Sequence, residues 1–143
     1  MDKRVLTIQD ISCVGQCSLT VALPIISACG IETAILPSSV LSNHTAKGYS
    51  GWTFCDLTDE MPKILERWQK ENIDFSAFYT GYVSKSQIPH ILDIMEKTAR
   101  PNALKVVDPA MADNGKLYAG FDDDFPNEMK KLCAKADVLI PNL

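Results

Sequence analysis

Residues 5–10 of this chain read Val-Leu-Thr-Ile-Gln-Asp, a short apolar run that ends in two polar side chains. A continuous apolar, β-branched run of this length is typical of a strand that is buried on both faces of a sheet. Further runs of the same kind follow over residues 31–36, 75–80, 104–107 and 138–140. The sequence therefore predicts five buried strands.

Segments with the character of helices separate these runs. They begin near residues 16, 58, 84 and 126, and the second carries Met61, Leu65 and Trp68 on one apolar stripe. Strands that alternate with helices predict an α/β fold, a mostly parallel sheet with helices on both faces. We expect a single domain over residues 1–143.

Two stretches, 38–57 and 109–125, have no helical period. We expect both to be long loops, and we expect 38–57 to act as a flap, because loops of this length are usually lids or binding loops. The last run, 138–140, has no helix after it. We therefore expect the chain to be the N-terminal portion of a longer, incompletely represented protein.

Composition narrows the class of protein. The chain is 46% hydrophobic and 22% charged, which excludes a disordered or collagen-like protein. Its net charge of −4 argues against a general nucleic-acid binder, which needs a dense cationic surface. No apolar run reaches the roughly 18 residues of a membrane span, and no signal peptide is apparent. We expect a cytoplasmic protein.

The five cysteines fit that compartment. Their number is odd and no second Cys/His pair completes a zinc site, so we expect no disulfide framework. We expect all five to be buried or half-buried thiols.

In a parallel sheet, ligands bind at the carboxyl ends of the strands. Asp10 and Asp108 close the first and fourth predicted strands, and Asp113 follows in the next loop. Carboxylates at this edge suit a magnesium–phosphate site. It is equally consistent with the spacing that Asp10 and Asp108 cap backbone N–H groups. The sequence contains no P-loop, no G-x-G-x-x-G after the first strand and no H-E-x-x-H.

Five short motifs occur in order along the chain: T-I-Q-D (7–10), S-N-H-T (42–45), T-G-Y (80–82), V-D-P-A-M-A-D (107–113) and I-P-N (140–142). Together they resemble the pyridoxal kinases of the ribokinase-like superfamily, over essentially the whole chain. The S-N-H-T and T-G-Y motifs are fairly specific to the vitamin B6 branch. The D-P-x-M-x-D stretch is shared with hydroxymethylpyrimidine kinases.

The resemblance implies ATP-dependent phosphorylation of the 5′-hydroxymethyl group of pyridoxal, pyridoxine or pyridoxamine. It implies Mg²⁺, ATP as co-substrate, a monovalent cation and a homodimer. The matching positions give a substrate-binding set, which is Asp10, His44, Thr45 and Tyr82. They also give a nucleotide-binding set, which is Asp108, Asp113, Tyr118 and Asn142, with Asp108 and Asp113 near the metal.

The chain departs from the family pattern at three points. Asp10 replaces a usual Ser and Ile140 an often-found Thr, and the G-x-G-D motif that carries the family's catalytic Asp is absent. The resemblance therefore places no catalytic residue within this chain. An ionised Asp10 can only accept hydrogen bonds, so we expect it to favour a cationic substrate such as pyridoxamine. The alternative is that Asp10 caps the following loop or helix.

Two other functions stay open on the sequence. One is a kinase for another hydroxymethyl heterocycle, such as hydroxymethylpyrimidine, although the S-N-H-T loop and Tyr82 favour pyridoxal. The other is a non-catalytic ligand-binding or subunit-interaction domain, which applies if the protein truly ends at Leu143.

Overall fold

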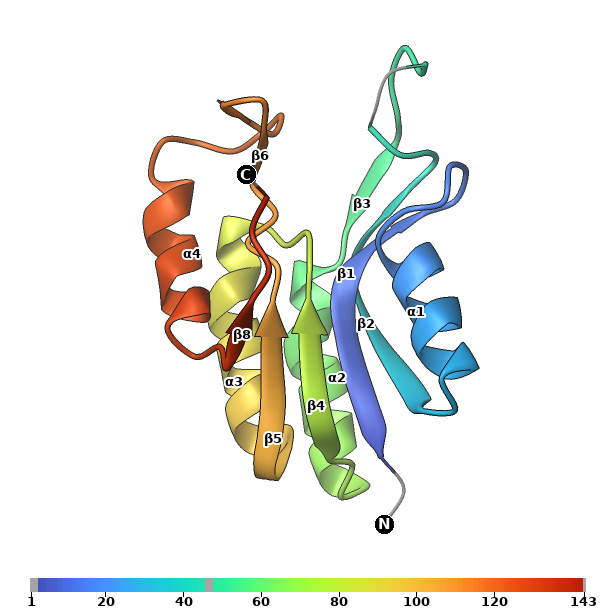
Figure 1. Ribbon diagram of the computed structural model, residues 1–143, viewed down its shortest axis with the longest axis vertical. Coiled ribbons are helices and arrows are strands. Elements are labelled where there is room, and N and C mark those ends of the chain that lie inside the picture. The colour runs from blue at the N-terminus through green and yellow to red at the C-terminus, as the bar shows by residue number, and fades with distance from the viewer. Residues whose placement is uncertain (1–2, 46–47, 143) are drawn as a thin grey trace.

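The computed structural model describes residues 3–45 and 48–142 (Figure 1). Its main sheet has the strand order β3-β2-β1-β4-β5-β8. The bounds are β1 (Arg4–Ser12), β2 (Glu32–Leu41), β3 (Phe54–Asp56), β4 (Phe75–Thr80), β5 (Ala99–Val107) and β8 (Val138–Leu139). Neighbouring strands are parallel except for β3, which pairs antiparallel with β2. The predicted mostly parallel α/β fold is confirmed.

Helices cover both faces of the sheet, as predicted. The helix α1 (Leu19–Ala28) packs against β1 and β2 on one face. The opposite face is covered by α2 (Met61–Lys70), α3 (Ile88–Thr98) and α4 (Phe125–Cys133), with the 3-10 turns Thr58–Glu60 and Lys85–Gln87 before α2 and α3 (Figure 1). The hydrophobic core lies on this second face and includes Leu6, Phe78, Ile91 and Met129, all at most 1% exposed.

The expectation that 38–57 is a loop without strands is wrong at both of its ends. The strand β2 continues past Pro37 to Leu41, and the chain returns as β3 on the outer side of β2. A register shift between Gln9 and Ile11 lets β2 carry one residue more than β1, which is a β-bulge. The bulge accommodates Pro37 in the strand. Residues 46 and 47, inside the predicted flap, lie outside the described residues.

Other boundaries also differ from the sequence expectation. Asp10 does not close the first strand, because β1 extends two residues further to Ser12. The strand β5 begins at Ala99, directly after α3. The loop 109–125 contains a hairpin of β6 (Ala112–Asp113) and β7 (Lys116–Leu117). Its turn residues Asn114 and Gly115 both have positive φ, the conformation that an Asn-Gly hairpin turn requires.

The expectation that all five cysteines are buried or half-buried is wrong for three of them. Cys13, Cys29 and Cys55 are exposed, whereas Cys17 and Cys133 are half-buried. All five are free thiols, in agreement with the absence of a disulfide framework. The exposed ones lie in the loop after β1, at the end of α1 and in the edge strand β3, where the described residues provide few neighbours.

Beside α1, the sheet presents an apolar surface that includes Val5, Ala77, Leu104 and Ile140. Leu104 and Ile140 are 46% and 43% exposed, so the described part of the chain covers this surface incompletely. Among the residues described, none of the helices is long and apolar enough to cross a bilayer.

Candidate functional site

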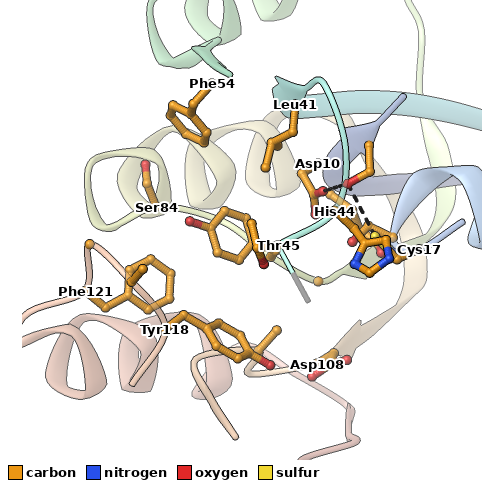
Figure 2. Close-up of a pocket in the computed structure, with 18 of the residues that line it drawn as sticks. Asp10, Cys17, Leu41, His44, Thr45, Phe54, Ser84, Asp108, Tyr118 and Phe121 are labelled. Atoms are coloured by element: carbon orange, nitrogen blue, oxygen red, sulfur yellow. Dashed lines mark hydrogen bonds between the residues drawn. The ribbon is translucent and has the colours of Figure 1, made fainter. Parts of the chain in front are cut away.

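A cleft of about 1380 Å³ opens above the carboxyl ends of β1, β4 and β5. Small-molecule pockets usually have volumes of about 300–1,000 Å³, so this cleft has room for two small ligands. It is lined by all but one of the residues that the sequence predicts for the site: Asp10, His44, Thr45, Tyr82, Asp108, Asp113 and Tyr118. Figure 2 draws Asp10 and Cys17 on one side and Ser84 and Phe121 on the other.

Asp10 occupies the buried end of the cleft. Side chains alternate along a strand, so Asp10 continues the row of Leu6 and Ile8 that forms the core. Its residue exposure is only 6%. The Ser12 hydroxyl donates to Asp10 Oδ2 at 3.3 Å, and the Cys17 thiol donates to Ser12 Oγ at 3.4 Å (Figure 2). These side chains form a short hydrogen-bonded chain that leads to the carboxylate.

His44 is held against the loop that follows β1. Its backbone N–H donates to the Val14 carbonyl at 3.0 Å, and its ring makes an edge contact with Tyr49. The imidazole lies directly over Gly15, where an added Cβ would come within 1.8 Å of His44 Cδ2. Gly15 also has φ +81°, a conformation that favours glycine. Because Gly15 has no side chain, the His44 ring of the predicted flap can pack against the loop that follows β1.

An aromatic stack forms one wall of the cleft. Tyr82 stacks on Phe121 with ring centroids 5.4 Å apart and an interplanar angle of 12°. Phe121 stacks on Phe125 at 3.8 Å and 8°, and Phe125 is 1% exposed in the core. Tyr118 meets both Tyr82 and Phe121 at a tilt. This flat wall suits a flat heteroaromatic ligand.

The other end of the cleft carries the predicted nucleotide-binding residues. Burial raises the pKa of the Asp108 carboxyl. Burial also raises the pKa of Tyr118, and Asp113 and Asp108 raise it further, so both carboxylates lie near its hydroxyl. Asn142, which does not line the cleft, donates from Nδ2 to Asp113 Oδ1 at 2.9 Å. Hydrogen bonds thus link Tyr118, Asp113 and Asn142, and Asp108 lies near Tyr118.

The tyrosines of the cleft are neutral hydrogen-bond donors at physiological pH. Burial raises the pKa of Tyr82, and the charges of Asp10 and Asp56 add to the effect. The pKa of Tyr79 is raised by burial and by Asp108, against a smaller opposite effect of Gln9. A phenol that stays protonated can donate to an anionic or phenolate oxygen of a ligand.

Among the residues that the structure describes, no backbone N–H donates to the carboxylate of Asp10 or Asp108, so the capping interpretation has no support there. No side chain caps α1, and Asp10 accepts a hydrogen bond from Ser12 rather than from a backbone N–H. Within residues 3–45 and 48–142, no cluster of three metal-binding side chains occurs. Two carboxylates are nevertheless the usual protein contribution to a magnesium–phosphate site, because phosphate and water supply the remaining ligands. Asp108 and Asp113 fit that pattern.

Sequence reasoning missed three contributors to the site. Cys17 belongs to the chain of hydrogen bonds to Asp10, although a half-buried Cys carries no distinctive sequence signal. Phe121 lies four residues before Phe125, a helical spacing that hints at ring contact, but Phe121 itself precedes α4. Gly15 could have been noticed only as a glycine between a strand and a helix.

Comparison with known proteins identifies relatives over the full length of the chain. The pyridoxal kinase of Dictyostelium discoideum is 31% identical over 150 residues, which cover 99% of this chain and 48% of that protein. The chain thus spans about half the length of the curated relatives that it matches. No family model matches the chain.

Solved structures give the same picture. A putative phosphomethylpyrimidine kinase from Bacteroides thetaiotaomicron, crystallised with pyridoxal, is 46% identical, has a TM-score of 0.94 and matches 100% of this chain with 50% of its own. Pyridoxal kinase from Lactobacillus plantarum is 37% identical, with a TM-score of 0.90, and matches 98% of this chain with 50% of its own. Pyridoxal kinase from Leishmania donovani in complex with ADP and pyridoxine is 25% identical, has a TM-score of 0.84 and matches 99% of this chain with 52% of its own.

The contact between Gly15 and His44 can be tested by replacing Gly15 with alanine. We expect Gly15→Ala to displace His44, because the new Cβ overlaps the ring, and to accelerate amide hydrogen exchange over residues 42–53. Gly30→Ala is the matched control. Gly30 has a similar φ of +76° but no atom within 4 Å of an added Cβ, so only backbone strain is added. Equal exchange over residues 42–53 in both variants would contradict this prediction.

The aromatic stack predicts a structural dependence of Tyr82 on Phe121. Phe121→Ala removes the ring that joins Tyr82 to the buried Phe125, and we expect it to lower the free energy of unfolding by about 1–3 kcal/mol. Phe121→Leu keeps most of the apolar volume, so its cost is smaller. Denaturant unfolding measures both, and near-UV circular dichroism reports the rearranged rings. An unchanged aromatic signal in Phe121→Ala would rule the coupling out.

Proposed function

Since the chain belongs to the pyridoxal kinase family, we propose that the gene product containing it phosphorylates B6 vitamers. The reaction transfers the terminal phosphoryl group of ATP to the 5′-hydroxymethyl group of pyridoxal, pyridoxine or pyridoxamine. The observation that carries the proposal is the single cleft that brings an aromatic wall and a buried carboxylate together with a second carboxylate network. Its volume accommodates two small ligands, as a transfer between them requires.

We assign the two ends of the cleft to the two ligands. Asp10, His44, Thr45 and Tyr82 contact the vitamer, whose flat ring lies along the aromatic wall. The nucleotide phosphates lie towards Asp108, Asp113, Tyr118 and Asn142. Support comes from solved relatives, one of which holds pyridoxal and another ADP with pyridoxine.

Asp108 and Asp113 would hold Mg²⁺, which when bound neutralises phosphate charge during transfer. The high pKa of Tyr118 keeps its phenol protonated, so it can donate to a phosphate oxygen. We propose no proton acceptor for the vitamer hydroxyl within this chain, because the sequence lacks the G-x-G-D motif. A monovalent cation and a homodimer belong to the same proposal and rest on the family resemblance alone.

Residues 42–53 are proposed to close over the bound vitamer as a flap. They connect β2 to β3 and carry His44 and Thr45 into the cleft. Closure of such a segment excludes water from a transferring phosphoryl group. The packing of His44 on Gly15 would anchor this segment to the loop that follows β1.

A kinase for hydroxymethylpyrimidine is the second candidate. The Bacteroides relative is named as a putative phosphomethylpyrimidine kinase, although its crystals contain pyridoxal. Both substrates are flat nitrogen heterocycles with a hydroxymethyl group, so the aromatic wall alone does not distinguish them.

The proposed function is tested by an ADP-release assay on the product of the complete gene. With Mg²⁺ and ATP, we expect turnover of pyridoxal, pyridoxine or pyridoxamine to exceed that of hydroxymethylpyrimidine. A higher kcat/KM for the pyrimidine would favour the second candidate. Vitamer binding without turnover would favour a non-catalytic ligand-binding domain.

The substitution Asp113→Asn tests whether Asp113 acts on the nucleotide or on the vitamer. The amide keeps the shape of the carboxylate and its contact with Asn142 but removes the charge near the phosphates. We expect the KM for Mg-ATP to rise at least about tenfold, with little change in the KM for the vitamer. Asp123→Asn, an exposed carboxylate of the same segment that does not line the cleft, serves as control. A change in vitamer KM alone would place Asp113 at the other end.

A further inference from the structure

Asp10 is a largely buried residue with one carboxylate oxygen, Oδ1, that is open to the cleft. The residue is 6% exposed and lines the cleft. Oδ2 accepts the 3.3 Å hydrogen bond from Ser12, whereas Oδ1 accepts none from the residues that the structure describes. A carboxylate removed from water costs several kcal/mol unless a charge or hydrogen-bond donor compensates it. Oδ1 is therefore available to a hydrogen-bond donor or a positive charge on a ligand in the cleft.

Neither of the described lysines that line the cleft forms an ion pair with Asp10: Lys85 pairs with other carboxylates, and Lys116 lies opposite Asp113 in the β6–β7 hairpin. Lys85 pairs with Asp122 at 3.2 Å and with Asp124 at 2.8 Å. The His44 ring packs over Gly15 and against Tyr49. Across residues 3–45 and 48–142, none of the ion pairs formed includes Asp10.

The neighbours of Asp10 hold the carboxylate in place rather than neutralise it. The Cys17 thiol donates to Ser12 Oγ at 3.4 Å, which leaves the Ser12 proton directed at Asp10 Oδ2. Both donors are uncharged, and a neutral hydroxyl bond offsets only part of the cost of a buried anion. A charged N–H donor would form a bond roughly twice as strong.

We propose that Asp10 selects, among flat heteroaromatic ligands, those that carry a protonated nitrogen, and that the ammonium group of pyridoxamine is its preferred partner. The inference rests on the proposed function for the location of the ligand ring. The inference adds to the proposed function the charge on the ligand that the cleft selects. A serine at this position would offer a neutral hydroxyl and would discriminate less between charged and neutral ligands.

The test is equilibrium binding by calorimetry, without nucleotide, on the product of the complete gene. Three probes share one ring shape: pyridoxamine has an ammonium group and a ring nitrogen, pyridoxine has the ring nitrogen, and the benzene analogue of pyridoxine has neither. We expect Asp10→Asn to weaken pyridoxamine about 10- to 100-fold and to leave the benzene analogue within about threefold. Asp122→Asn is the matched control, since it removes an exposed cleft carboxylate while Lys85 keeps Asp124.

The pattern across the probes decides the outcome. If Asp10→Asn weakens the binding of pyridoxamine alone, the ammonium group is the partner of Asp10. Equally weakened binding of pyridoxamine and pyridoxine, with the benzene analogue unchanged, would support selection for a protonated nitrogen but would overturn the ammonium group as the preferred partner. Equal loss of all three probes, equal loss in Asp122→Asn, or binding of none by the unsubstituted protein would overturn the inference.

Thermal unfolding without ligand provides an independent readout. Asn retains the acceptor for Ser12 but removes the uncompensated charge, so we expect Asp10→Asn to raise Tm by at least about 2 °C. A lower Tm would mean that Asp10 already has a compensating partner in the protein, which would overturn the inference. Neither readout uses ATP. A gene product that binds charged vitamers selectively but transfers no phosphoryl group would refute the proposed function alone.

Discussion

The parallel alignment of β1, β4 and β5 is the constraint on which the rest of the site depends. Parallel strands end at the same edge, so residues far apart in the chain meet there without any local signal to bring them together. Thr80 of β4 pairs with Ile8 of β1 and with Val107 of β5. The polar residues that follow each of these positions therefore converge on one cleft. The apolar core beneath them holds this register, because a slip by one residue would reverse every side chain.

That convergence explains why the sequence could place some of the candidate residues at one edge of the sheet, whereas it could not predict the contacts between loops. Asp10, Tyr82 and Asp108 follow apolar strand runs, and a parallel sheet gathers such positions whatever the loops do. The stack of Tyr82 on Phe121 and the contact of His44 with Gly15 depend instead on how two loops meet in space. Neither contact has a periodic signal, because the partners are separated by loops of irregular conformation.

The fold expectation failed where local signals competed with pairing. Pro37 suggested that the second strand ends, since proline cannot donate to a ladder. The bulge between Gln9 and Ile11 resolves the conflict, and β2 runs on to the buried Leu41. Pairing with β3 then becomes possible, which converts both ends of the predicted flap into strand. The connection between β2 and β3 is consequently shorter than the predicted flap, and the strands on either side of it pair with each other.

The carboxylates at the two ends of the cleft differ in how their negative charge would be compensated. Asp108 and Asp113 lie near the Tyr118 phenol, and the Mg²⁺ of the proposed function would offset the charge of these two carboxylates. At Asp10, a single carboxylate lies beside neutral donors, and we propose that the compensating charge is carried by the ligand. One cleft thus combines a site suited to a metal-bound anion with a site suited to an organic cation. Under the proposed function, these two ends would be occupied by the vitamer and by Mg-ATP.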